Sequence, residues 1–434
     1  MFLLCVREVF AGGGVEEEVS MMPLIFGLIL LSFTYMAAHV IVDRLQRRYL
    51  FVSGIEYVAL GMGLSYLAVF HNPQTYLPAI TFAIGWVGLT YGLKLSVGVV
   101  IRSGAMLRLA LTEFFVVGLG LGAFVTFVTY SLLHQDWSVS LVCGGMLGSA
   151  SLAGSDSAIE VIKQRYPRLQ SHLLQSLFQG AQINNLLAIM MFTLVMCTYN
   201  REKLVPGFYE SFPLQGGAIL ALITLFGGLI LAFLYKLFLL SPHSDDGPST
   251  EETRKSDNSR FLALTGIICF ASGAAYFVNI PVLALTVALG WGLSRTHHKE
   301  PIYAMMESAK KPAMLILLVF AGVQIKGIAL TKVAALLCAV VLLRVLLKAC
   351  SSWLCGYGSS IRSDLFRGHL SQGIISLAIA LSFQGSVSGE GGAIVYAVAV
   401  LSVAINELIS PRWLRGLLID IGEIRDEVSL AKEV

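Results

Sequence analysis

Charged side chains are scarce in this chain of 434 residues. Aspartate, glutamate, lysine and arginine make up 13% of it, against about 25% in a typical soluble domain. Hydrophobic residues make up 56%, and the mean hydropathy is +0.76. A soluble protein of this composition would expose large apolar patches and aggregate. The chain is therefore predicted to be an integral membrane protein whose main solvent is the lipid bilayer.

Several functional signatures are also missing. The net charge is only +3 and no basic stripe with interleaved aromatic residues is present, so nucleic acid is not expected as a partner. The seven cysteines form no CxxC pair and lie mostly in apolar runs, which is typical of small core residues and not of disulfides or metal ligands. Phosphate-binding loops, HExxH and a GxSxG elbow with partners are absent. The sequence predicts no enzyme, no catalytic residue, no metal and no cofactor.

Apolar stretches long enough to cross a bilayer fill most of the chain. A spanning helix needs about 20 mostly apolar residues, and about thirteen stretches qualify. The predicted fold class is an all-α polytopic membrane protein. The predicted spans are 23–42, 50–70, 76–98, 107–133, 138–162, 170–198, 213–240, 260–277, 280–295, 311–330, 332–356, 367–386 and 391–410.

Basic residues in the loops predict the orientation. Alternate loops hold nearly all of the loop lysines and arginines, whereas the opposite set holds only Arg201, Lys203, Lys326 and Lys332. Because positive loops stay in the cytoplasm, the N-terminus is expected outside and the C-terminus inside. Short loops, polar cytoplasmic tails and the lack of an organelle signal favour a bacterial inner membrane.

The predicted domain organisation is a single membrane domain with short ends. An extracytoplasmic segment covers residues 1–22, and the membrane domain covers residues 23–415. A polar, flexible cytoplasmic loop is expected at 241–260, near the middle of the chain, where it would join two halves. Residues 416–434 are predicted to form a cytoplasmic tail.

Ionisable residues inside predicted spans are functional candidates, because a charge in a bilayer costs several kcal/mol. Asp156 and Glu160 are four residues apart, as are Arg344 and Lys348, and Lys94 lies near the end of a span. Glu160 and Lys94 have a simpler explanation, since both could reach the cytoplasmic interface. Arg344 could pair with a lipid phosphate. Asp156 and Lys348 lie beside glycine-rich or helix-breaking sequence and are the stronger candidates.

Neutral polar residues add to this set. They can serve as interhelical hydrogen-bonding groups or as ligands, and His39 is more often a packing residue than a proton relay. They are Ser155, Gln175, Gln179, Gln182, Asn184, Asn185, Gln372 and the lone His39.

Five segments together resemble the cation:proton antiporter superfamily, which includes sodium/proton antiporters. The most specific is AGSDSAIEVIKQRYPRLQSHLLQSLFQGAQINNLLAIMMF at 153–192, which is similar to the family's pattern TDpvav…P.rl…l.geslinDa.aivlf. The others appear in the family's order and cover about 50–415 of the chain. They are IGWVGLTYGLKLSV (84–97), LVFAGVQIKGIAL (318–330), LFRGHLSQGIISLAIAL (365–381) and AVLSVAINELISPRWLR (399–415).

The resemblance implies inverted repeats and two broken helices that cross in the membrane. The broken helices would be the spans that hold Ser155 with Asp156 and Gln372 with its neighbours. Charges that compensate the broken helix ends would be Asp156 and Lys348, or less favourably Arg344. The resemblance also implies a homodimer and transport of a monovalent cation and a proton.

The family's ion site is a dipeptide, Asn-Asp in electroneutral members and Asp-Asp in electrogenic ones. The matching residues here are Asn184 and Asn185, so the second position departs from the pattern. An amide can ligate a cation through its carbonyl oxygen, but it cannot carry a proton. The usual carrier of the exchange cycle is therefore missing.

Three hypotheses remain open from the sequence. The first is an antiporter-like secondary transporter for Na⁺ or K⁺ against H⁺, with Asp156 or Glu160 supplying the carboxylate beside Ser155 and the two asparagines. The second is an anion or neutral-solute carrier on the same fold, in which Lys348 makes the cavity positive. The third is a transport-inactive membrane scaffold or sensor subunit.

Overall fold

A computed structural model describes most of the membrane domain. The described residues are 29, 55–66, 76–95, 104–167, 169, 171–204, 213–239, 250–296, 299–308, 310–325, 330–357, 362–387 and 389–424. The predicted segment 1–22, nearly all of the predicted span 23–42 with His39, and residues 241–249 and 425–434 lie outside this part.

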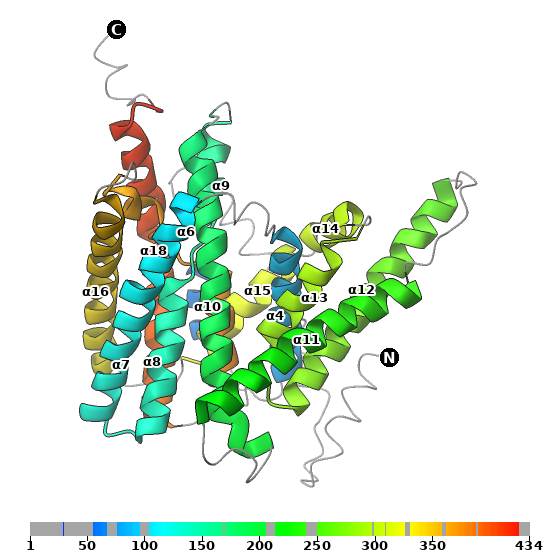
Figure 1. Ribbon diagram of the computed structural model, residues 1–434, viewed down its shortest axis with the longest axis horizontal. Coiled ribbons are helices and arrows are strands. Elements are labelled where there is room, and N and C mark those ends of the chain that lie inside the picture. The colour runs from blue at the N-terminus through cyan, green and yellow to red at the C-terminus, as the bar shows by residue number, and fades with distance from the viewer. Residues whose placement is uncertain are drawn as a thin grey trace.

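The described residues form helices and no strand (Figure 1), which confirms the all-α class. In chain order the helices are α3 (Ile55–Leu64), α4 (Leu77–Lys94), α6 (Gly104–Glu113), the π-helical turn η3 (Phe114–Leu119), α7 (Gly120–Ser131), α8 (Trp137–Leu152), α9 (Ser157–Arg165), α10 (His172–Leu204), α11 (Pro213–Leu239), α12 (Thr250–Phe277), α13 (Val282–Leu293), α14 (Lys299–Ser308), α15 (Lys310–Val323), α16 (Leu330–Gly356), the 3₁₀ turn η4 (Leu365–Gly368), α17 (Ile374–Gln384) and α18 (Glu390–Asp420).

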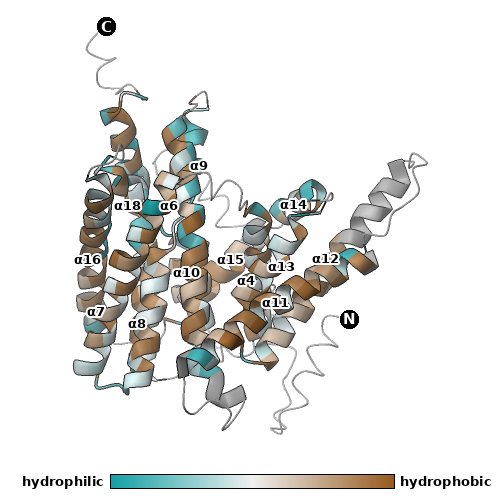
Figure 2. Cartoon of the chain, viewed as in Figure 1, coloured by the Kyte–Doolittle hydropathy of each residue, from teal (hydrophilic) through white to brown (hydrophobic). Residues whose placement is uncertain are grey.

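Six stretches of the described chain are long and apolar enough to cross a membrane. Apolar residues cover the middle of the helices and polar residues gather at their ends (Figure 2). Large apolar side chains are exposed along α11, among them Leu222, Phe226, Ile230 and Phe233. Lipid tails would cover such a face. The fold is therefore that of an integral membrane protein, while the number of thirteen spans stays a prediction.

Three boundaries show how well the pattern placed the helices. The chain divides between α12 and α13 at Asn279, which has a φ of +54° and lies two residues before Pro281. This division agrees with the predicted boundary between the spans 260–277 and 280–295. Helix α12 begins at Thr250, inside the loop predicted over 241–260. Helix α18 continues through Pro411 to Asp420, ten residues beyond the predicted end of the span at 410. A proline removes one backbone donor and bends a helix, but neighbouring packing can carry the helix past it.

The helices gather in two groups (Figure 1). Helices α6 to α10, α16 and α18 lie at one side, and α4 with α11 to α14 at the other. In the second group α4 and α13 pack backbone against backbone, because a Cβ on Gly92 would lie 2.3 Å from the carbonyl oxygen of Val287. In the first group α8 is buried on every side from Val142 to Leu152, so it forms the centre of the bundle.

Candidate functional site at two unwound helices

Two helices of the bundle are interrupted, and their interruptions lie against each other. Residues 153–156 are unwound between α8 and α9, and residues 369–373 between η4 and α17. The Ser371 hydroxyl donates to the carbonyl oxygen of Ser155 at 2.8 Å. A Cβ on Gly373 would lie 2.7 Å from Ser155 Oγ, so only glycine allows this approach. We call the two unwound segments the junction. Both breaks fall in the spans where the family resemblance implied them.

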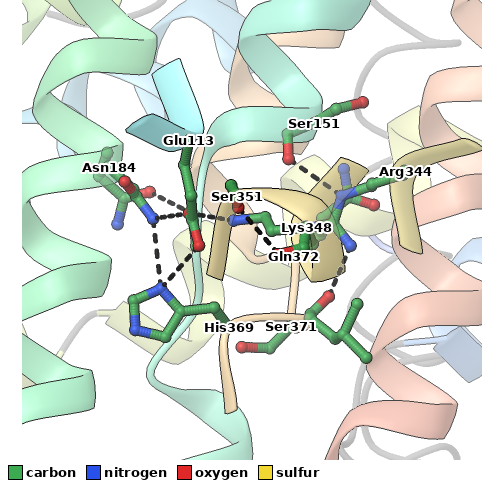
Figure 3. Close-up of polar contacts among 12 residues, drawn as sticks. Glu113, Ser151, Asn184, Arg344, Lys348, Ser351, His369, Ser371 and Gln372 are labelled. Atoms are coloured by element: carbon green, nitrogen blue, oxygen red, sulfur yellow. Dashed lines mark hydrogen bonds and ion pairs between the residues drawn. The ribbon is translucent and has the colours of Figure 1, made fainter. Parts of the chain in front are cut away.

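Side chains satisfy the carbonyl groups that unwinding leaves without helical donors. The Arg344 guanidinium donates from Nε to the carbonyl oxygen of Ser151 at 2.9 Å and from Nη1 to that of Leu370 at 2.7 Å. It thereby joins the end of α8 to the second unwound segment (Figure 3). Gln372 Nε2 donates to the carbonyl oxygen of Ala150 at 2.9 Å. The positive guanidinium is fully buried and lies where carbonyl dipoles carry partial negative charge.

Lys348 contacts a carboxylate and not the broken helix ends that the family resemblance assigned to it. Its Nζ is 2.5 Å from Glu113 Oε2, and neither side chain is exposed to solvent. Asn184 Nδ2 donates to the same carboxylate oxygen at 2.6 Å, and His369 Nδ1 is 3.4 Å from the other oxygen (Figure 3). Glu113 stands directly before the π-helical turn Phe114–Leu119. The lysine charge is therefore neutralised by a carboxylate, and the contacts with the broken helix ends are made by the arginine.

The carboxylates proposed from the sequence lie at the edge of the junction. Asp156 precedes the first residue of α9, and its side chain is 28% exposed and 3.9 Å from Lys94 Nζ. Glu160 is exposed on α9. Asn185 lies inside the bundle, where its Oδ1 accepts a hydrogen bond of 3.0 Å from the backbone N–H of Gly154. Asn185 therefore holds the first unwound segment in place. Lys94 is paired with Asp156 and Glu307.

A small cavity of about 60 Å³ opens beside the junction. At roughly 10–15 Å³ for each water-sized occupant, it has room for a few waters or for one small ion without its full hydration shell. Its polar wall is formed by Ser155, Ser157, Gln372 and Glu407, and the rest is apolar side chains from α3, α15, α17 and α18. Glu407 is the one ionisable residue among those that line the cavity.

Three buried ionisable residues of the site were not singled out from the sequence. Glu113 lies in the predicted span 107–133 and Glu407 in the predicted span 391–410, so the cost of a charge in a bilayer was a signal for both. His369 lies just after η4, in the predicted span 367–386, and carried the weaker signal of a histidine inside a span, as His39 did. Within the described residues no three His, Cys, Asp or Glu side chains are grouped as a metal site.

Unwound segments buried inside a bundle of apolar helices are typical of secondary transporters. Comparison with known protein families and with curated protein sequences gave no match. Among solved structures, the fold is similar to that of the sodium proton antiporter MjNhaP1 from Methanocaldococcus jannaschii. The TM-score is 0.62 at 15% sequence identity, and the match covers 91% of this chain and 99% of the antiporter chain. The likeness shows that the two chains share a fold.

Proposed function

We propose that this chain is a secondary transporter that exchanges a monovalent cation, Na⁺ or K⁺, for a proton. The observation that carries the proposal is the cavity at the junction, which has a carboxylate and two serine hydroxyls in its wall. Oxygen atoms suit hard cations, and a carboxylate also takes a proton. The antiporter-type fold supports this choice by analogy.

The placement of the two buried basic side chains, Lys348 and Arg344, favours a cation over an anion as the transported ion. An anion carrier would need Lys348 or Arg344 to face the cavity. Lys348 is bound to Glu113, and Arg344 donates to two backbone carbonyl oxygens. Neither residue lines the cavity. The carboxylate of Glu407 therefore decides the charge of the cavity wall when it is ionised.

Proton flux in proteoliposomes tests the proposal. A pH gradient is imposed on vesicles that contain a pH-sensitive dye, and Na⁺, K⁺, Li⁺ or choline is then added. We expect an alkali cation, but not choline, to dissipate the gradient. A gradient that no alkali cation changes would refute exchange and favour the anion carrier or the inactive scaffold.

Asn185→Asp is the informative variant beside wild type. An aspartate keeps the oxygen that accepts from Gly154 and adds a charge, so the first unwound segment should stay in place. We expect a changed cation selectivity or pH response of the flux. Membrane location with the N-terminus outside and assembly as a homodimer belong to the same proposal. Cysteine accessibility and cross-linking in membranes test them.

A further inference from the structure

A short sequence repeat links the two sides of the junction. Residues 183–187 read INNLL in α10, and residues 405–409 read INELI in α18. Helix α10 follows the first interrupted helix along the chain, and α18 follows the second. The two repeats differ mainly at one position, where α10 has Asn185 and α18 has Glu407.

The two dipeptides contact the junction in parallel ways. Asn185 and Glu407 both reach the first interrupted helix. Asn185 accepts from the backbone N–H of Gly154, and Glu407 Oε2 accepts from the Ser157 hydroxyl at 2.6 Å. Their preceding asparagines both turn to the second interrupted helix. Asn406 Nδ2 donates to Gln372 Oε1 at 2.8 Å.

Asn184 Nδ2 is in turn 3.4 Å from His369 Nδ1, at the start of the second unwound segment. The asparagine–carboxylate pair that is missing at Asn184 and Asn185 in α10 is therefore present at Asn406 and Glu407 in α18.

Glu407 has free capacity to bind a ligand. Its Oε1 atom is buried and has no hydrogen-bond partner among the described residues, and the residue is 6% exposed in the wall of the cavity. Ser155 Oγ donates to Ser157 Oγ at 2.6 Å, so two more oxygens lie next to the carboxylate. Pro411 lies four residues later inside α18 and has no N–H, so the Glu407 carbonyl oxygen also lacks its helical donor.

We propose that Glu407, held between Asn406 and the serines of the first interrupted helix, is the group that binds the proton or the dehydrated monovalent cation in turn. The protonated carboxyl releases its proton to one side of the membrane, and the ionised carboxylate then takes the cation with Ser155 and Ser157. Oε1 cannot hold both, which makes the exchange obligatory. The charged side chains whose fields reach Glu407 are Arg344 and Asp156. This inference rests on the proposed exchange and names its carrier.

The first test is flux through Glu407→Gln in the proteoliposome assay. Glutamine keeps an oxygen that can accept the hydrogen bond from the Ser157 hydroxyl, so the fold should persist. Its amide cannot bind and release a proton, so the proposed carrier is lost. We expect cation-triggered proton flux to fall to the level of protein-free vesicles, and Glu407→Asp to restore part of it. The matched control is Glu390→Gln on the same helix, since Glu390 is 68% exposed and paired with Lys332. Flux that survives in Glu407→Gln, or is lost only in Glu160→Gln, overturns the inference.

The second test does not depend on flux. Dicyclohexylcarbodiimide reacts with protonated carboxyl groups in apolar surroundings, and mass spectrometry locates the modified residue. We expect Glu407 to be modified in detergent-solubilised protein, and Na⁺, K⁺ or Li⁺ to protect it where choline does not. Modification that no alkali cation reduces contradicts cation binding at Glu407. Protection at Glu407 without any wild-type flux refutes exchange but keeps the binding site, whereas flux without protection refutes the site alone.

Discussion

The buried pair of Lys348 and Glu113 gives a quantitative prediction about folding. Lys348→Met keeps most of the side-chain volume but leaves Glu113 without its cation in a fully buried place, where either a lone charge or the proton uptake that removes it costs free energy. Asn184 remains as a hydrogen-bond donor to the carboxylate. A neutral amide cannot replace the ammonium group of the lysine, which lies directly against Glu113 Oε2. We therefore expect Lys348→Met to destabilise the protein strongly, whatever it does to transport.

The size of the effect follows from the burial. Removal of one partner of a buried ion pair costs about 3–5 kcal/mol, and a lone charged residue at the centre of a membrane helix costs about 2.5–3.5 kcal/mol on insertion scales. Both figures point to about 3 kcal/mol for Lys348→Met. The exposed pair of Lys332 and Glu390 has side chains that are 54% and 68% exposed. Lys332→Ala should cost no more than about 1 kcal/mol.

Thermal unfolding in detergent, followed by tryptophan fluorescence, measures the difference. Lys348→Met should lower the unfolding temperature far more than Lys332→Ala does. Adding Glu113→Gln to Lys348→Met removes the carboxyl group that lost its cation and should recover much of the lost stability. A double-mutant cycle measures this coupling between the two positions. A double variant with the summed losses of the two single variants would refute the reasoning, as would a Lys348→Met protein as stable as wild type.

Two further predictions concern the junction. Gly373→Ala places a Cβ 2.7 Å from Ser155 Oγ and should lower both the stability and the cation-triggered proton flux. Gly385→Ala is the control, because the nearest neighbour atom of its Cβ would be 3.8 Å away, and it should change neither property. Equal unfolding temperatures for the two variants would contradict the close packing at Gly373. Arg344→Lys keeps the charge but loses the guanidinium that spans the carbonyl oxygens of Ser151 and Leu370. The unmade bond should cost about 1–3 kcal/mol, measured by the same unfolding assay, and an unchanged unfolding temperature would rule out this bridging role.

Part of the site was predictable from the chain alone. Glycine-rich sequence next to Asp156 marked the first interrupted span as unusual, and the resemblance to the antiporter superfamily implied both interruptions. Asn184 and Asn185 were recognised as a departure from an asparagine–aspartate pair. Glu113 and Glu407 carried the same signal as Asp156, a charge inside an apolar span.

What the sequence by itself determined is the class of protein and the composition of its elements. Low charge and long apolar stretches require a membrane, and the bilayer then requires helices, because backbone groups must be satisfied within each segment. Tertiary structure decided which buried charges meet. Lys348 and Arg344 are one helical turn apart on α16, yet one binds Glu113 and the other binds backbone carbonyl oxygens. The contacts Lys348–Glu113, Ser371–Ser155 and Ser157–Glu407 each join residues more than 200 positions apart. Helix periodicity carries no information on such contacts between helices.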